Sequence, residues 1–367
     1  MITAFFSPDE TIIALSAEPA TTGSESTPLD RETLDRWSAP YRKWHYYPEL
    51  VVTAALEPEL GFTMVDGPNV FWHDGQWQMF YFGFDRRGYQ ACRAVSDDLL
   101  HWEGRGLLMS YGEPGTFDRG GVVFTGALFD SVSVDRVPRL GRWRDRYWVL
   151  YGCYPEQGGY ELGHGGQGLA WSQDGMSWHR ASRTRPVLSV DGGAAWEEKV
   201  IYSPCLIRHE GVFWNFYNAR GSANTEQIGF ARSLDLTHWE RFPGNPVVTN
   251  RADGFDALLA ADPELYRDGD HWTMIYFGAS RNNPDRRLHA HTMIAFSRDL
   301  IHWTAHPEPI FKAGGHPAGL DSMHAHNVSL VNNPEDNTRY VFYCAVGSQG
   351  RGIALLTSKP ITAHSER

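Results

Sequence analysis

The 367-residue sequence is poor in cysteine and contains no long apolar run. Its 4 cysteines stand singly, without the C-x-x-C spacing of metal sites and redox motifs, and we expect them to be buried free thiols. No stretch reaches the roughly 18 apolar residues that a membrane-spanning helix requires. The first residues lack the basic segment of a secretion signal, so we expect a cytoplasmic protein.

Basic residues are also in the minority, because 33 Lys and Arg stand against 44 Asp and Glu, for a formal net charge of −11. Nucleic acids and anionic membranes bind basic surfaces, so we expect neither as a partner. Glycine and aromatic residues are instead abundant, with 37 Gly, 14 Trp, 16 Tyr and 19 Phe. This composition predicts many short strands joined by tight turns, and it argues against a helical bundle.

A seven-residue pattern, Ser-x-Asp-(Leu/Gly)-x-x-Trp, recurs along the chain, beginning at Ser96, Ser172, Ser233 and Ser297. An apolar segment rich in aromatic residues precedes each copy and occurs once more near the end of the chain. These segments are residues 79–83, 148–152, 214–218, 274–278 and 341–345. The spacing indicates a repeat architecture, in which the recurring Asp and Trp serve turns and packing and are not catalytic.

Further apolar segments before and after each of these give four strands per repeat. Five such repeats over about 300 residues predict an all-β, five-bladed β-propeller with four-stranded antiparallel blades. The fifth repeat lacks a fourth strand, and we expect the N-terminal strand Thr11–Ser16 to pair with that edge and close the ring. Residues 1–60 would hold this strand, a crossover and a short helix from the N-cap Thr27 to Trp37; residues 61–360 would form the propeller.

In a propeller, the residues just before the first strand and just after the second strand of each blade meet around the axial funnel. Polar residues at or near these places are Asp66, Asp85, Asp118, Thr125, Glu197, Glu198, Tyr202, Asn218, Arg220, Asp262, Glu264, His324, His326 and Arg351. Carboxylates beside His, Arg and Tyr are the groups that glycoside cleavage needs. One carboxylic acid protonates the leaving oxygen, and another group attacks the sugar or activates water.

The first repeat resembles a known class of enzymes. Asp66-Gly-Pro-Asn-Val, the segment 72–81 and the turn 96–102 are similar to the first blade of the five-bladed glycoside hydrolases of families 43, 32, 68, 117 and 130. The resemblance covers roughly residues 61–359, and it implies a general base or nucleophile at Asp66.

Within this class the subfamily stays open. Phe124-Thr125-Gly126-Ala127 is similar to the Phe-Ser-Gly-Ser strand of the β-fructosidases, but the Trp-Met-Asn-Asp-Pro-Asn-Gly, Arg-Asp-Pro and Glu-Cys signatures are absent, which disfavours an invertase. In family 117 a histidine of a late blade is the acid. The resemblance implies that His324 or His326 could take this role.

These observations predict a glycosidase that removes one sugar, such as a furanose, from a short oligosaccharide. Asp66 would be the base or nucleophile, and Asp262 or Glu198 the acid. We expect no cofactor, although His324 and His326 could hold an axial ion. The residues expected to bind substrate are Asp85, Asp118, Thr125, Tyr202, Asn218, Arg220, His324, His326 and Arg351.

Two long insertions, Ser131–Arg146 and Pro155–Gly168, should narrow the funnel into a pocket. Two other functions stay open. A glycoside phosphorylase would need cationic ligands for phosphate, and the candidates are Arg86, Arg87, Arg281, Arg286 and Arg351. A non-catalytic sugar-binding propeller would bind carbohydrate without turning it over.

Overall fold

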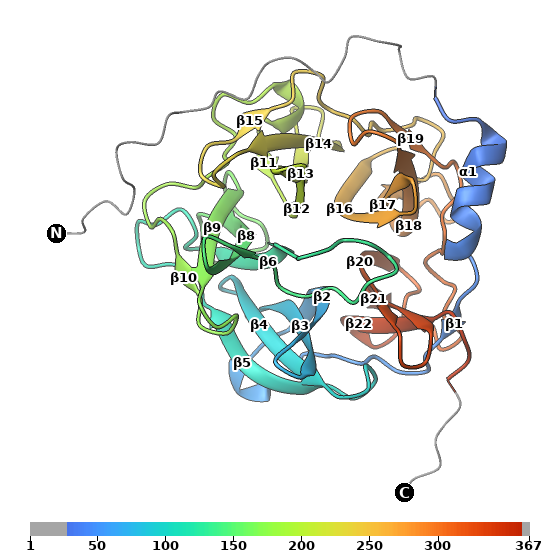
Figure 1. Ribbon diagram of the computed structural model, residues 1–367, viewed down its shortest axis with the longest axis horizontal. Coiled ribbons are helices and arrows are strands. Elements are labelled where there is room, and N and C mark those ends of the chain that lie inside the picture. Colours follow the sequence, from blue (N-terminus) through green and yellow to red (C-terminus); the bar gives the residue numbers. More distant parts are fainter. Residues whose placement is uncertain (1–27, 362–367) are drawn as a thin grey trace, which may run out of the picture.

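The computed structural model describes residues 28–361, and this part of the chain is an all-β fold (Figure 1). Its strands pair antiparallel in consecutive groups. Short parallel contacts join some neighbouring groups, as between Tyr89 and Gly121 and between Ala290 and His324. The helices of the described residues are too short or too polar to cross a membrane. All the cysteines are buried and free, as predicted.

The strands of the groups are as follows. The first group is β2 (Met64–His73), β3 (Gln76–Phe84), β4 (Tyr89–Ser96) and β5 (Glu103–Met109). The second is β6 (Gly121–Ala127), β8 (Arg146–Tyr154), β9 (Gly166–Ser172) and β10 (His179–Arg180), with β7 (Arg142–Trp143) beside β8. The third is β12 (Cys205–His209), β13 (Val212–Arg220), β14 (Glu226–Ser233) and β15 (Glu240–Arg241), with β11 (Val200–Ile201) on β13.

The fourth group is β16 (Leu259–Asp268), β17 (His271–Ser280), β18 (His289–Ser297) and β19 (Trp303–Ala305). The fifth is β20 (His324–Asn333), β21 (Thr338–Gly347), β22 (Gly350–Thr357) and β1 (His45–Tyr46). Figure 1 shows that β2, β6, β12, β16 and β20 lie nearest the centre of the molecule. The starts of these innermost strands are therefore brought together.

The recurring Ser-x-Asp pattern forms the turn after the third strand of a group. In its first copy the hydroxyl of Ser96 accepts hydrogen bonds from the backbone N–H groups of Asp98 (3.2 Å) and Leu99 (2.9 Å). The Asp98 carboxylate in turn accepts from the backbone of His101, and the Trp102 indole donates to the Leu99 carbonyl. The three later copies repeat these contacts. The Asp and Trp of the pattern are thus structural.

The outer edge of β22 is paired with residues from the start of the described chain. His45 and Tyr46 lie opposite Thr357 and Leu356, and Val52 pairs with Ile353. The prediction that Thr11–Ser16 pairs with this edge was therefore wrong, because residues 45–52 already occupy it. Thr11–Ser16 itself lies outside the described residues.

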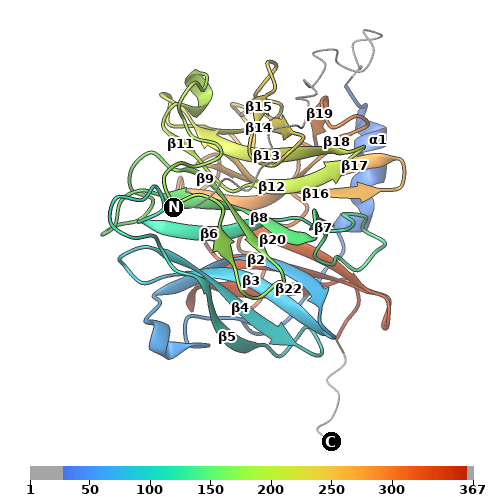
Figure 2. The same cartoon turned by 60° about the vertical axis from the view of Figure 1, so that its left-hand side comes forward.

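The short helix before the strands is present as α1 (Arg31–Ser38), but it begins later than predicted. Its N-cap is Asp30, whose carboxylate accepts from the Thr33 N–H at 2.8 Å, and the predicted cap Thr27 lies outside the described residues. The Trp37 ring stacks on His271 of β17, with 3.9 Å between centroids. This contact seats α1 beside the fourth group, as Figure 2 also shows.

The two insertions of the second group go to different places. Residues 131–136 cross the centre of the molecule from β6 to β16, where Val134 donates to the Arg267 carbonyl at 3.0 Å (Figure 1). Residues 155–165, between β8 and β9, bring Tyr160 and Glu161 to a pocket at the starts of the innermost strands. Of the two insertions, the second narrows this pocket and the first closes the opposite end.

Candidate active site

A pocket of about 340 Å³ opens where the innermost strands begin. Asp66 of β2, Asp262 of β16 and the histidines of β20 come from these strand starts. Arg220 ends β13, Glu226 opens β14, and Arg351 lies at the start of β22. The charged and imidazole groups that line the pocket are Asp66, Glu161, Arg220, Glu226, Asp262, His324, His326 and Arg351.

Irregular strand pairing turns these side chains into the pocket. The register shifts between Asp66 and Asn69 on β2, between Ala261 and Glu264 on β16, and between His326 and Val328 on β20. Such bulges re-aim side chains that a regular strand would direct elsewhere. Asp262 has a φ of 49°, in the left-handed region that few non-glycine residues adopt, which is common at functional sites.

Asp66 forms the buried floor of the pocket, with no exposed surface. Its Oδ1 accepts from the Gly67 N–H (2.6 Å) and from Asn327 Nδ2 (2.9 Å), and its Oδ2 is paired with Arg351. Burial opposes ionisation of Asp66, but the charges of Arg351 and His326 and the Asn327 amide together hold its pKa below the ordinary value. Asp66 is therefore a carboxylate at neutral pH.

Asp262 has the opposite character. Burial raises its pKa to about 8, against the hydrogen bond from Ser203, and the nearby charge of Asp66 adds to this effect. Its backbone N–H donates to Asn218 Oδ1 at 3.2 Å, which fixes the start of β16. Asp66 and Asp262 thus form one pair of carboxyl groups, the first ionised and the second protonated near neutral pH.

Glu161 and Glu226 form a second pair. Burial raises the pKa of Glu161 to about 7, and among neighbouring charges that of Glu226 contributes most. Glu226 is 4% exposed; its Oε1 accepts from Arg220 Nε (3.1 Å) and Nη2 (2.5 Å), and its Oε2 accepts from Asn218 Nδ2 (2.8 Å). Burial raises the pKa of Glu226 as well, but Arg220 and Asn218 stabilise its ionised form.

These two glutamates were missed in the sequence. Glu226 opens the third strand of its group, and Glu161 lies within an insertion, so neither occupies the strand ends that were searched. The insertion 155–168 was expected to narrow the funnel, and a carboxylate within it was the available signal for Glu161.

The two histidines of β20 are neutral at pH 7. Burial lowers the pKa of His324 to about 4 and that of His326 to about 3. His324 Nδ1 accepts from the Ala290 N–H at 3.1 Å, so its proton lies on Nε2. His324 therefore offers an N–H donor, suited to a sugar hydroxyl.

Tyr202, Asn218, Arg220, His324, His326 and Arg351, expected as substrate ligands, all line the pocket. The predicted acid Glu198 does not: it is an exposed residue at the end of a 3₁₀ turn, and its assignment was wrong. Asp85 also lies outside. Its carboxylate accepts from the Arg87 and Gly88 N–H groups, both at 3.0 Å, and so serves its own turn.

Asp118 and Glu197 were assigned to the funnel because each precedes an innermost strand, but both serve the fold. A tyrosine of the second strand donates to a carboxylate of this kind in every group: Tyr81 to Glu57, Tyr151 to Asp118, Tyr217 to Glu197, Tyr276 to Asp256 and Tyr343 to Asp321. Arg180 also pairs with Asp118 at 2.5 Å, and Arg241 with Glu197 at 3.0 Å. Their predicted funnel position was therefore wrong.

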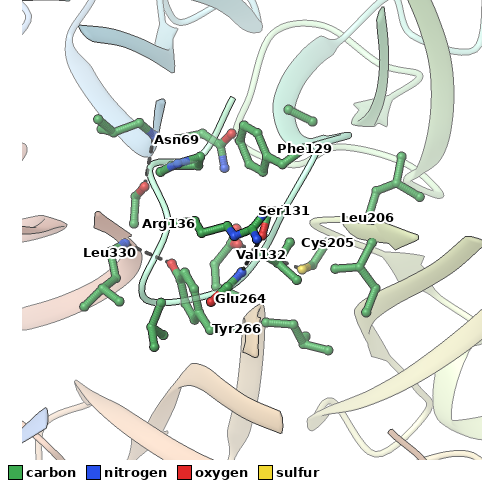
Figure 3. A pocket seen from close by; sticks show the side chains of 18 of the residues that line it. Asn69, Phe129, Ser131, Val132, Arg136, Cys205, Leu206, Glu264, Tyr266 and Leu330 are labelled. Carbon is green, nitrogen blue, oxygen red and sulfur yellow. Dashed lines mark hydrogen bonds between the residues drawn. The ribbon is translucent and has the colours of Figure 1, made fainter. Parts of the chain in front are cut away.

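A second, smaller cavity of about 40 Å³ lies farther along the innermost strands. Figure 3 shows the loop with Ser131, Val132 and Arg136 passing across it. Glu264 lines this cavity rather than the larger pocket, and burial raises its pKa well above the ordinary value. Thr125 also faces this side, where its hydroxyl donates to the Pro204 carbonyl at 3.1 Å, so its expected place in the funnel was wrong.

Among the described residues, Asp66, His326 and Cys344 offer ligand atoms within 4.8 Å of one another. A cation already occupies this group, because the Arg351 guanidinium pairs with Asp66 and its Nε lies 3.4 Å from Cys344 Sγ. The arrangement therefore fits a guanidinium and not a metal ion.

Comparisons with known proteins agree with this geometry. The family model of the glycosyl hydrolases family 32 N-terminal domain matches residues 56–240 and 143–350. The chain therefore belongs to this family and, with it, to the glycoside hydrolases of this fold.

Solved structures are similar over nearly the whole chain. A structure described as a complex of BT0996 and RGII is 26% identical, with a TM-score of 0.77 over 92% of this chain and 97% of that one. A structure described as a glycoside hydrolase is 25% identical, with a TM-score of 0.77 over 92% and 98%. A thermostable family-43 glycoside hydrolase, 16% identical with a TM-score of 0.58 over 82% and 95%, shares the fold. A search of curated proteins finds no match.

Proposed function

We propose that this protein hydrolyses an O-glycosyl bond and releases one terminal sugar from a short oligosaccharide in the pocket around Asp66 and Glu226. One observation carries the proposal: carboxyl groups of opposite protonation state converge in one pocket, with arginines on the ionised members. Glycoside cleavage requires this combination of a protonated acid and an ionised carboxylate.

We further propose that the strand groups are the blades of a five-bladed propeller and that β1 closes its ring. The pairing of β1 with β22 and the central position of the innermost strands support this interpretation. The small cavity behind the pocket is closed by residues 131–136, which supports a pocket with one mouth and hence cleavage at a chain end.

Glu161 is our candidate for the acid. A general acid works best when its pKa lies near the working pH, and the pKa of Glu161 is raised to about 7. Glu226 is the corresponding base or nucleophile, because its charge acts on Glu161 more strongly than that of any other carboxylate and Arg220 keeps it ionised. Asp66 with Asp262 is the alternative pair, and the resemblance of the first repeat implies a base or nucleophile at Asp66.

Several groups would hold the sugar. The Nε2–H of His324, the Asn218 amide and the exposed part of the Arg220 guanidinium offer donors to hydroxyls. Aromatic side chains supply the apolar face that a sugar ring requires, and they are Phe82, Tyr89, Tyr154, Tyr160, Tyr202 and Phe277. The similar structure that is described as an RGII complex supports a carbohydrate substrate.

Phosphorolysis is less compatible with the pocket. Its arginines, Arg220 and Arg351, are each paired with a carboxylate, so little positive charge is left for phosphate. Arg87 is paired with Asp85 outside the pocket. We expect the rate of sugar release to be the same with and without inorganic phosphate. A rate that rises with phosphate and yields a sugar phosphate would instead identify a phosphorylase.

Isosteric variants test the proposal. We expect Glu161→Gln and Glu226→Gln each to lower kcat/KM for an oligosaccharide by on the order of 10²- to 10⁴-fold. Glu210→Gln is the matched control, because Glu210 lies on a turn far from the pocket and its side chain is 84% exposed. Full activity of both pocket variants would show that this pair is not catalytic, and loss in Asp66→Asn and Asp262→Asn alone would identify the alternative pair.

A further inference from the structure

The candidate acid is carried by a loop whose position depends on its neighbour. Tyr160 precedes Glu161, and its Oη accepts a hydrogen bond from Arg351 Nη1 at 2.7 Å. The Tyr160 ring packs edge-on against Phe84, with 5.8 Å between centroids, and against Tyr89, with 5.6 Å. The loop is thus attached to the first and fifth strand groups through one side chain.

The backbone of this loop needs such an attachment. Glu161 has a φ of 52°, in the left-handed region that costs free energy for any residue with a Cβ. Gly158 and Gly163, on either side, also have positive φ, of 96° and 83°. Glycines lose more conformational freedom on ordering than other residues, so contacts outside the loop must hold this conformation.

Arg351 connects the loop to the floor of the pocket. Its Nη2 pairs with Asp66, its Nε approaches Cys344, and its Nη1 donates to Tyr160. Asp66 is fully buried, and its other oxygen is held by Gly67 and Asn327. The guanidinium is therefore a fixed point to which the loop is fastened.

We propose that Tyr160 is a positioning residue, which through Arg351 holds the 155–165 loop so that the Glu161 carboxyl stays partly buried beside Glu226. The catalytic meaning of this position rests on the proposed function, but the position itself does not. Burial is the largest cause of the raised pKa of Glu161. Release of the loop into water therefore lowers that pKa toward its ordinary value.

Tyr160→Phe tests this role, because it removes the oxygen that accepts from Arg351 and keeps the ring between Phe84 and Tyr89. We expect amide hydrogen exchange of residues 155–165 to rise several-fold. We also expect the protonated Glu161 carboxyl, followed by infrared difference titration and assigned with Glu161→Gln, to ionise at lower pH. The alkaline limb of kcat should then move to lower pH, because a general acid is active only while protonated.

Tyr111→Phe is the matched control. It also removes one tyrosine hydroxyl, which lies 3.5 Å from Asp85 Oδ2 outside the pocket, and it should change none of these measurements. Unchanged exchange and an unchanged Glu161 titration in Tyr160→Phe would overturn the proposal. If these change while Glu161→Gln stays fully active, the positioning role stands and the catalytic assignment of Glu161 fails.

Discussion

Arg351 pairs with Asp66 although 285 residues separate them in the sequence. The pair joins β2 of the first strand group to β22 of the fifth group, at the floor of the pocket. Because Asp66 has no exposed surface, the charge of each partner depends on the other. This pair therefore contributes to both the stability of the fold and the electrostatics of the site.

Asp66→Asn should be destabilising because it leaves the Arg351 guanidinium mostly buried without its counter-ion. Removal of one partner of a buried pair costs about 3 kcal/mol or more. The ionised form of Asp66 contributes its stability above the ordinary pKa of 3.8, and this is lost as the pH falls through the lower pKa of the folded state. Urea unfolding at pH 7 and pH 3 should show the difference between variant and wild type shrinking in acid. An equal difference at both values would contradict the pairing.

Asp262→Asn should have the opposite pH dependence. The pKa of Asp262 is raised to about 8, so its protonated form favours the folded state, and stability is lost as the pH rises from 3.8 toward 8. Asparagine does not titrate, so the variant should gain stability relative to wild type between pH 5 and pH 8. Chemical denaturation at these two values measures the gain. The same relative stability at both would show that Asp262 is ionised at pH 5 in the folded protein.

Asp118→Asn separates a structural role from substrate binding. Asp118 is fully buried and accepts from Tyr151 and Arg180, so its neutralisation should lower the melting temperature. KM for the oligosaccharide should not change below that temperature, because Asp118 lies outside the pocket. An increased KM without loss of stability would restore the ligand role that the sequence had suggested.

Glu198→Gln should leave kcat/KM unchanged. Glu198 was the acid expected from its place before the third strand group, but its side chain is exposed away from the pocket. Steady-state kinetics on the oligosaccharide, beside the Glu210→Gln control, measures this. A loss comparable with that of Glu161→Gln would mean that Glu198 reaches the substrate.

The fold was largely predictable because its signal is local and repeated. The Asp98 carboxylate and the Trp102 indole satisfy backbone groups within five residues of sequence, so the Ser-x-Asp turn can be identified without tertiary information. The edge strand was not predictable in the same way. His45–Tyr46 is a two-residue strand with no periodicity, and its pairing with β22 depends on the ring around it.

The site was predictable only where side chains follow from strand position. Asp66 and Asp262 begin innermost strands, and both line the pocket. The same rule failed for Asp118 and Glu197, because a buried tyrosine hydroxyl in each group requires an acceptor and a carboxylate before the innermost strand supplies it. Glu161 depends on an insertion with no equivalent in the other repeats.

The role of Glu161 as the acid is tested most directly by varying the leaving group. A substrate whose aglycone is a good leaving group, such as a nitrophenol, needs no protonation, so Glu161→Gln should cleave it at a rate close to wild type. The same variant should be strongly impaired on the oligosaccharide, and the alkaline limb set by a pKa of about 7 should disappear from its pH profile. Equal impairment on both substrates, with that limb retained, would contradict the assignment.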